Sequence, residues 1–397
     1  MPACKRSAGW RQVLTRLLPR AARGVLLGAA VALAGQQALA QGDVQPATAP
    51  GAPAPLTVVS WGGAYEAAQR RAIFAPFARA TGIELRILRY DGGLDSLRRR
   101  AGPEGWDIID MLEPTAISAC EAGLLAPLDA TRVLDANART LRGDFAQARL
   151  RRCAIPQNVF ATVMAYDDRA FPGVKPTRIE DFFDVERFPG KRAIAKSPDG
   201  ILEWALLAEG VPPEQVYDLL STARGLKLAF RRLERLRGHV LWWQDAADPP
   251  RLLSSGQAVM ASGYNGRFFT AARLQGAPID VIWDGRIIGH DVWAVVAGTD
   301  RPDAARRFLA YALHPDRMAR LAERIPYGPA RRSAMARIGL HPDTGIPMRA
   351  HLPNAPQHGA RRLVRDGDWY SHTRAIRQRR FEAWLQRGSA GSETDTP

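Results

Sequence analysis

Short apolar runs alternate with amphipathic helical segments along most of the chain, and this alternation restricts the fold more than any other feature. Residues 56–61 and 83–88 are predicted strands, and the segment between them, 65–80, has its apolar residues at helical spacing. A predicted helix that begins at 95 precedes a strand over 106–111. Strand, helix, strand, helix, strand is typical of a parallel sheet with helices on its faces, so we expect an α/β fold.

A second region of the same kind follows a predicted strand over 159–166. A chain of this length exceeds what one hydrophobic core usually serves, so we expect two lobes. Ligands bind sheets of this kind at the carboxyl ends of the strands, which makes Trp61 and Glu113 candidate cleft residues. Further strands are expected at 193–195, 240–243, 258–261, 281–283 and 292–296, and helices at 201–209, 217–223, 227–237, 303–312 and 315–324.

Residues 1–40 have the composition of a secretory signal. Lys and Arg residues without any acid precede an apolar run at 24–35, and Ala38-Leu39-Ala40 matches the small-x-small pattern of a cleavage site. The run is too short to cross a bilayer, which needs about 20 apolar residues. We therefore expect cleavage before Gln41 and a soluble protein in the periplasm. Residues 41–55 and 388–397 lack large apolar groups and are predicted to be a flexible linker and a disordered tail.

The chain is basic, with a formal net charge of +15. Its arginines are spread at helical spacing among alanine and leucine, whereas a nucleic-acid binder gathers basic and aromatic residues on one face. No zinc-finger, RRM-like or helix-turn-helix pattern occurs in the sequence. We therefore expect a solvated arginine-rich surface and no nucleic-acid partner.

Cys120 and Cys153 remain after removal of the leader. An exported pair without metal-ligand spacing is a candidate disulfide. Two separate buried thiols are the alternative, because the sequence does not supply the Cα separation that a bridge requires. Both interpretations stay open at this point.

Sequence motifs of catalysis are missing. The chain has no G-x-S-x-G elbow, no H-E-x-x-H pair, no P-loop and no C-x-x-C, and its histidines are scattered. We therefore expect neither a metal nor a cofactor, and a protein that binds without catalysing. A hydrolase or lyase whose residues meet only in space is the alternative from another class, since triads are defined by geometry and not by order.

A series of short phrases runs through the chain in a fixed order: VVSWGGAYEAAQ, FARATGIELR, DIIDMLEPTAISACEAGLLAPLD, FFDVERFPGKRA, LLSSGQAVMASGYNGR, IDVIWDGRIIGHDVWAV and IPYGPARRSAM. In these phrases the chain resembles the spermidine/putrescine-type periplasmic binding proteins of bacterial ABC importers. The resemblance implies the two-lobed type II fold with a ligand cleft between the lobes, which close by hinge motion. Lobe 1 would comprise 56–163 and 290–350, and lobe 2 would comprise 164–289 and 351–387. It also implies a monomer that delivers a small molecule to a membrane permease.

Matching the family's pocket position by position suggests an amine ligand. Trp61 stands where the family has its first-lobe aromatic residue, and Tyr264 where a Trp usually covers the ligand's methylenes. Asp291 stands where an aspartate binds an ammonium group. Carboxylates and aromatic faces both attract ammonium, which favours a polyamine or a related amine. Trp242 and Trp243 face opposite ways in a predicted strand, so we expect one in the core and assign Trp243 to the cleft.

Departures from the family pattern suggest a second ligand class. The loop at 196–200 lacks the acids of polyamine binders apart from Asp199, and Gly289 replaces an aromatic residue. Arg267 stands where putrescine binders have a further acid, and an arginine would repel a second ammonium and attract a carboxylate. A zwitterionic, amino-acid-like or opine-like solute, with its amine at Asp291 and its carboxylate at Arg267, is therefore the alternative. Arg267 could instead point outward, and Glu113 could simply begin a helix, where an acid suits the helix dipole.

Overall fold

The computed structural model describes residues 54–145, 148–359 and 361–390. The predicted signal peptide, most of the predicted linker and the last residues of the predicted tail lie outside these ranges. Helix α16 continues to Ala390, so the prediction of a disordered tail from 388 onward was wrong for its first residues. Within the described ranges, no helix has both the length and the apolar character that crossing a membrane requires.

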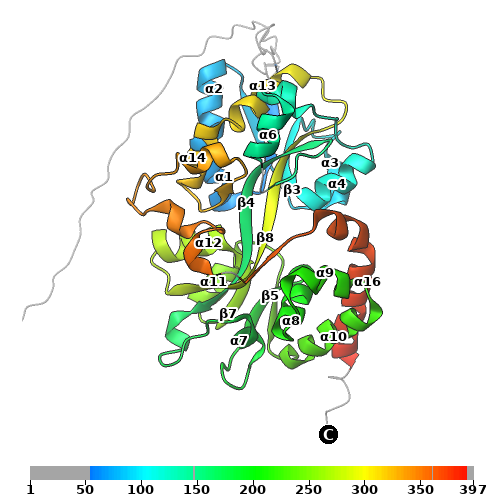
Figure 1. Cartoon of the computed structure of the whole chain (residues 1–397), viewed down its shortest axis with the longest axis vertical. Coiled ribbons are helices and arrows are strands. Elements are labelled where there is room, and N and C mark those ends of the chain that lie inside the picture. The colour runs from blue at the N-terminus through cyan, green and yellow to red at the C-terminus, as the bar shows by residue number, and fades with distance from the viewer. Residues whose placement is uncertain (1–53, 146–147, 360, 391–397) are drawn as a thin grey trace, which may run out of the picture. The chain divides into compact units, whose positions relative to one another are not determined.

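The described strands form one mixed sheet in the order β2-β1-β3-β8-β4-β7-β5-β6, with β10 beside β8 and β9 beside β4 (Figure 1). Helices cover the faces of this sheet, which confirms the α/β class. The strands are β1 (Leu56–Ser60), β2 (Leu85–Arg89), β3 (Ile108–Leu112), β4 (Ala154–Asp167), β5 (Arg192–Ala195), β6 (Val240–Trp243), β7 (Met260–Tyr264), β8 (Ile279–Val295), β9 (Gly328–Pro329) and β10 (Arg362–Val364).

The helices follow the predicted amphipathic segments with small shifts at their ends. The predicted helix over 65–80 is divided by a π-helical turn at Arg70–Phe74, but its apolar face is buried as expected, and Gly82 ends it with a φ of 71°. The α-helices are α1 (Gly63–Gln69), α2 (Ala75–Thr81), α3 (Leu94–Arg100), α4 (Glu113–Glu121), α5 (Ala130–Leu134), α6 (Ala138–Asp144), α7 (Ile179–Phe183), α8 (Ile201–Ala208), α9 (Val216–Leu220), α10 (Ala223–Leu233), α11 (Asp248–Ser254), α12 (Asn265–Phe269), α13 (Pro302–Ala312), α14 (Pro315–Ala322), α15 (Arg332–Met335) and α16 (Gly367–Ala390).

The prediction of a parallel sheet was right only for the outer strands. β1 pairs in parallel with β2 and β3, and β5 pairs in parallel with β6 and β7. The long central strands are antiparallel: β8 to β3 and β4, and β4 to β7. Strands β4 and β8 link the two alternating regions of the sequence. Because these two strands are antiparallel to each other, and to β7 and β3 respectively, the sheet as a whole is mixed.

The strands expected at 281–283 and 292–296 are one continuous strand, β8. The polar residues between them hid this continuity, because they interrupt the apolar pattern that indicates a strand. The structure satisfies them locally: buried Arg286 donates hydrogen bonds to the carbonyl oxygens of Pro353 at 2.8 Å, His358 at 2.8 Å and Gly359 at 3.0 Å. A buried arginine with carbonyl partners avoids most of the desolvation penalty. The strand is irregular at this point: the β4–β8 register shifts between the pairs Thr162–Ile287 and Met164–Ile282, and Gly285 has a φ of 69°.

Two of the apolar core groups draw on different parts of the chain. One group includes Phe77, Trp293 and Phe308, drawn from the first region and from the chain after β8. Another includes Phe182 and Trp204 of the second region and Trp384 of α16. Side chains of β4 and β8 contribute to both groups, as expected of strands that run from one lobe into the other.

Cys120 of α4 and Cys153, just before β4, form a disulfide with Cα atoms 5.8 Å apart. Of the two alternatives left open by the sequence, the structure has the bridge. It ties α4 to the beginning of a strand that continues from one lobe into the other.

Candidate functional site

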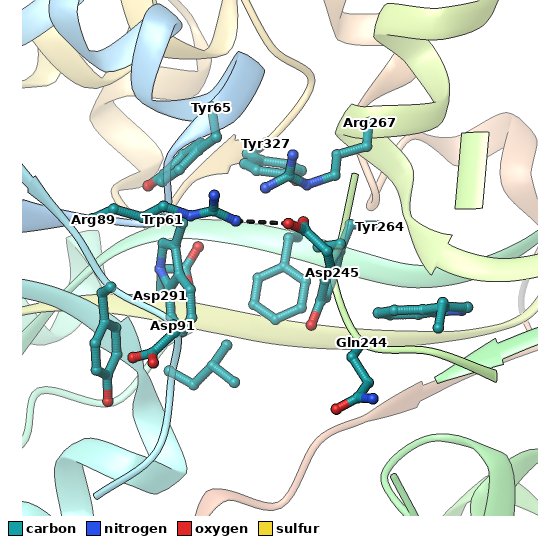
Figure 2. A pocket seen from close by; sticks show the side chains of 15 residues that line it. Trp61, Tyr65, Arg89, Asp91, Gln244, Asp245, Tyr264, Arg267, Asp291 and Tyr327 are labelled. Carbon is teal, nitrogen blue, oxygen red and sulfur yellow. Dashed lines mark hydrogen bonds and ion pairs between the residues drawn. The ribbon is translucent and has the colours of Figure 1, made fainter. Parts of the chain in front are cut away.

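A cavity of about 400 Å³ lies where the ends of β1, β2 and β7 meet the central strand β8 (Figure 2). Its walls combine aromatic rings with charged side chains from both halves of the sequence. The lining residues are Trp61, Tyr65, Arg89, Tyr90, Asp91, Leu112, Phe160, Trp243, Gln244, Asp245, Ala246, Tyr264, Arg267, Asp291 and Tyr327.

The aromatic side chains of the cavity pack against one another in tilted and edge-on pairs. Tyr65 and Tyr327 have ring centroids 5.4 Å apart, and Phe160 and Tyr264 have theirs 5.5 Å apart. Such contacts hold the rings in place before a ligand arrives. The faces that they present suit the methylene groups and the positive charge of an alkylamine.

Asp291 and Asp110 form an acidic pair at the sheet. Leu112 is the register partner of Asp291, and Asp110 lies two residues before Leu112, so both carboxylates lie on the same face of the sheet. Asp110 is fully buried and accepts hydrogen bonds from Tyr65 Oη at 2.8 Å, Gln69 Nε2 at 2.6 Å and Trp61 Nε1 at 3.2 Å. Asp291 lines the cavity and, in the described ranges, forms no ion pair.

The electrostatics of this pair favour a cationic ligand. Burial raises the pKa of Asp291 well above its usual range, and the charge of Asp110 raises it further. Burial also raises the pKa of Asp110, although its hydrogen-bond donors oppose the shift. Two buried carboxylates without a counter-ion resist ionisation. An ammonium group placed against Asp291 would therefore supply the positive ion-pair partner that this carboxylate does not have in the described part of the protein.

Arg267 brings a positive charge into the same cavity from α12 (Figure 2). Its guanidinium lies against Gly63 at the start of α1: a Cβ atom at Gly63 would stand 2.7 Å from Nη1. Gly63 has a φ of 61°, and this left-handed backbone conformation is what favours glycine at the position. Among the described residues, no carboxylate forms an ion pair with Arg267. The cavity thus has an acid and a base on different walls, neither neutralised by the other.

A second cavity of about 290 Å³ adjoins the first and shares Leu112, Trp243, Gln244 and Tyr264 with it. Its other polar lining residues are Thr162, Lys196, Ser197, Asp199, Ser262 and Arg365. Within the described part of the chain, His, Cys, Asp and Glu residues form no cluster that could hold a metal ion.

Five of the residues predicted for the site line the main cavity. They are Trp61, Trp243, Tyr264, Arg267 and Asp291. Asp199 lies in the second cavity and forms an ion pair with Arg377 at 3.3 Å. Trp242 points the other way from Trp243 and packs on Phe381 and Trp384, as strand alternation requires.

Glu113, which the sequence placed either in the cleft or at the start of a helix, is paired within the protein. It lies outside both cavities, and its buried carboxylate accepts a hydrogen bond from Arg151 Nε at 2.7 Å and lies 3.6 Å from His290 Nδ1. Glu113 is in the first turn of α4, and its carboxylate meets Arg151, which precedes β4.

Several lining residues were missed, and each had a different signal. Tyr65 opens a helix directly after the strand-end glycines, a position that suits a pocket as well as a core. Arg89 ends strand β2, Asp245 follows strand β6, and the two pair across the cavity at 2.8 Å (Figure 2). Tyr327 lies in the phrase IPYGPARRSAM, which marked the family but not the pocket, and Arg365 comes from a segment without a periodic pattern.

Comparisons with known proteins agree with this geometry. Residues 72–347 match the family of bacterial extracellular solute-binding proteins. The γ-aminobutyric acid (GABA)-binding protein of Pseudomonas aeruginosa is 36% identical over 336 residues, which are 84% of this chain and 91% of that protein. The structure of the PBP MotA from A. tumefaciens B6 in complex with glucopine is similar, with a TM-score of 0.74, 27% identity and coverage of 83% of this chain and 99% of that one. A GABA receptor of known structure has a TM-score of 0.69, 26% identity and coverage of 83% and 97%.

The comparisons confirm the two-lobed binding-protein fold and the expectation that the protein binds a solute without catalysis. They also support a location outside the cytoplasm. The comparisons support the wider family of extracellular solute-binding proteins. They do not point to spermidine or putrescine as the ligand. The chain belongs to the bacterial extracellular solute-binding proteins and serves an ABC importer as its binding protein.

Proposed function

We propose that the protein captures a small zwitterion, an amino acid whose amine and carboxylate are well separated, and delivers it to its permease. The ammonium group would pair with Asp291 and the carboxylate with Arg267. The observation that carries this proposal is the presence of these two opposite charges in one cavity, neither with an ion-pair partner in the described ranges. GABA is a small solute with the required groups; one relative is named a GABA-binding protein and another a GABA receptor.

Desolvation explains why a zwitterion fits better than a ligand of one charge. When the lobes close on a ligand by hinge motion, Asp291 and Arg267 lose water, and a buried charge without a partner is costly. A zwitterion compensates both side chains at once with charge-assisted hydrogen bonds. The aromatic rings between them, Tyr264 and Tyr327, would cover the methylenes of the ligand.

A polyamine is the second candidate, and the pair of buried carboxylates is the observation that favours it. Asp110, however, already accepts hydrogen bonds from Tyr65, Gln69 and Trp61. A second ammonium would also meet Arg267. Both facts make the polyamine the weaker of the two ligand classes.

The proposal includes the organisation of the whole protein. We infer lobe boundaries at 56–163 with 290–350 and at 164–289 with 351–387, which the division of the core residues supports. The leader would direct the protein to the periplasm and be removed before Gln41. The mature protein would act as a monomer that presents its closed form to the permease.

A panel of four ligands tests the zwitterion directly. The protein, purified from the periplasm with its own leader removed, is titrated calorimetrically with GABA, butylamine, butyrate and putrescine. We expect GABA to bind at least about 100-fold more tightly than the others, because each of them leaves Arg267 or Asp291 without its partner. Tighter binding of putrescine than of GABA would contradict the zwitterion and favour the polyamine.

Breaking the Arg89–Asp245 pair should affect GABA binding much less than leaving Arg267 or Asp291 without a partner. The two side chains are 64% and 44% exposed, and exposed pairs contribute about 0.2–1 kcal/mol. We therefore expect Asp245→Asn to raise the Kd for GABA by no more than about fivefold at low salt, and to have almost no effect at about 1 M NaCl, where such pairs are screened. A larger loss that persists at high salt would mean that Asp245 contacts the ligand.

A further inference from the structure

Arg365 stands in the wall of the second cavity without an ion pair. It follows β10, and its backbone amide donates to the carbonyl oxygen of Ile288 at 2.8 Å, which fixes the residue beside the central strand β8. The guanidinium stacks over the ring of Tyr370 at 4.5 Å. Its Nε is buried and has no hydrogen-bond partner, and no carboxylate in the described ranges forms an ion pair with it.

The acids nearest to Arg365 are engaged elsewhere. Asp199 pairs with Arg377. Glu203 is fully enclosed, accepts a hydrogen bond from the Tyr370 hydroxyl and accepts another from the Gly200 amide at 2.9 Å. Burial raises the pKa of Glu203, which favours its neutral form.

Among the residues that line the second cavity, Arg365 and Lys196 are cationic and Asp199 is acidic, so positive charge is in excess there even though Asp199 and Glu203 act electrostatically on Arg365. Lys196, an exposed residue that also lines it, adds to this excess. An arginine held in a cavity without a counter-ion is suited to a planar anion that can accept two hydrogen bonds.

The two cavities form one series of charged groups. Tyr264 lines both, and the charges of Arg365, Asp291 and Arg267 all influence its hydroxyl, so this residue stands among the three. Arg365 also acts on Asp291, whose carboxylate it helps to ionise. A ligand that extends from the first cavity into the second would meet a base, an acid and then a second base.

We propose that the second cavity is an anion subsite in which Arg365 binds a second carboxylate of the ligand. The preferred ligand would be an N-carboxyalkyl amino acid: a secondary ammonium at Asp291, one carboxylate at Arg267 and another at Arg365. This inference rests on the proposed function, because it takes the positions of the first carboxylate and the amine from it. It adds a residue that selects ligands with an acidic arm over simple amino acids.

A matched pair of ligands tests the second carboxylate. N-(3-carboxypropyl)-GABA and N-butyl-GABA are both secondary amines. They differ only at the end of the N-alkyl chain, where the first has a carboxylate and the second a methyl group. In wild-type protein we expect the dicarboxylate to bind about tenfold or more tightly than N-butyl-GABA. In Arg365→Gln this difference should vanish, while GABA, which has no second carboxylate, should lose less affinity than the dicarboxylate loses. Arg365→Lys, which keeps the charge without the planar fork, should retain part of the difference.

The outcomes separate this inference from the proposed function. Equal or weaker binding of the dicarboxylate in wild-type protein, or no binding of it at all, overturns the inference whether or not GABA binds. A loss of GABA binding in Arg365→Gln, with an unchanged melting temperature, also overturns it, because Arg365 would then hold the first carboxylate. The proposed function fails on a different readout: GABA binding that is absent, or that Arg267→Gln leaves intact.

Discussion

Replacing Asp291 with asparagine should abolish most of the affinity for GABA. Asp291 lines the cavity and has no ion-pair partner in the described ranges; the side chain of Asn158, a neutral amide, is its hydrogen-bond partner. Truncation of one member of a buried charge pair costs about 2–5 kcal/mol, which is a loss of at least about 30-fold in Kd. Titration calorimetry of Asp291→Asn against the wild type measures this loss.

The free protein should not be destabilised by the same change. Burial and Asp110 raise the pKa of Asp291 in the folded protein, so Asp291 stabilises the fold at low pH, and this contribution is lost as the pH rises through the folded pKa. Asparagine cannot ionise, so the variant never has to bury the carboxylate charge. We therefore expect Asp291→Asn to melt at the same or a higher temperature than the wild type, which separates lost binding from lost folding.

The pH dependence of ligand affinity should have the opposite sign to the contribution of Asp291 to folding stability. A bound ammonium favours the ionised form of Asp291, so binding releases a proton wherever the free carboxyl is still protonated. The affinity for GABA should rise with pH across the acidic range until Asp291 is ionised in the free protein. Calorimetry in buffers with different ionisation enthalpies counts the protons released, and an affinity that falls with rising pH in this range would contradict the assignment.

Asp91 provides the matched control. It lines the same cavity, but its carboxylate accepts a hydrogen bond from Ser96 Oγ at 2.6 Å and is 67% exposed. Asp91→Asn removes a negative charge from the same cavity, but it leaves Asp291, the proposed partner of the ligand's ammonium group, in place. We expect its effect on the Kd for GABA to stay below about fivefold. Equal losses in the two variants would indicate a general loss of negative potential in place of a contact at Asp291.

The fold and part of the site could be predicted because they depend on local patterns. The alternation of apolar runs and helices indicated the α/β class, and strand ends followed by glycine or by a helix pointed to Trp61. Tyr264, Arg267 and Asp291 were placed by resemblance, and they line one cavity. These residues share a simple property: each lies at a strand end or within a recognisable phrase, so its position in the chain nearly determines its position in space.

The remaining site residues depend on contacts between distant segments. Asp110 lies inside an apolar strand, and only the register of β3 against β8 brings it to the face that Asp291 occupies. Glu113 has the sequence position of a cleft residue, yet Arg151, which precedes β4, binds its carboxylate. Arg365 reaches the second cavity because β10 pairs with β8. No local pattern encodes these pairings.

Removal of the Cys120–Cys153 disulfide should have the largest effect on stability. The bridge joins residues 33 positions apart, and a cross-link of this span lowers the entropy of the unfolded chain by an amount worth about 3–4 kcal/mol at 25 °C. We expect Cys120→Ala to lower the free energy of unfolding by about this amount, and the melting temperature by roughly 5 °C. Wild-type protein melted with a strong reductant should show the same shift, and Cys120→Ala should be insensitive to the reductant.

The choice of Cys120 separates the cross-link from packing. Cys153 is 2% exposed, so its removal would also leave a cavity, whereas Cys120 is only half-buried. If the double variant is no less stable than Cys120→Ala, the loss belongs to the cross-link; a further drop measures the packing of the Cys153 side chain. Because α4 also holds Glu113, whose partner Arg151 reaches Asp368 of α16 at 3.1 Å, the bridge secures a contact between α4 and the C-terminal helix. An unchanged melting temperature in Cys120→Ala would show that this ion network, without the disulfide, is enough to hold α4 in place.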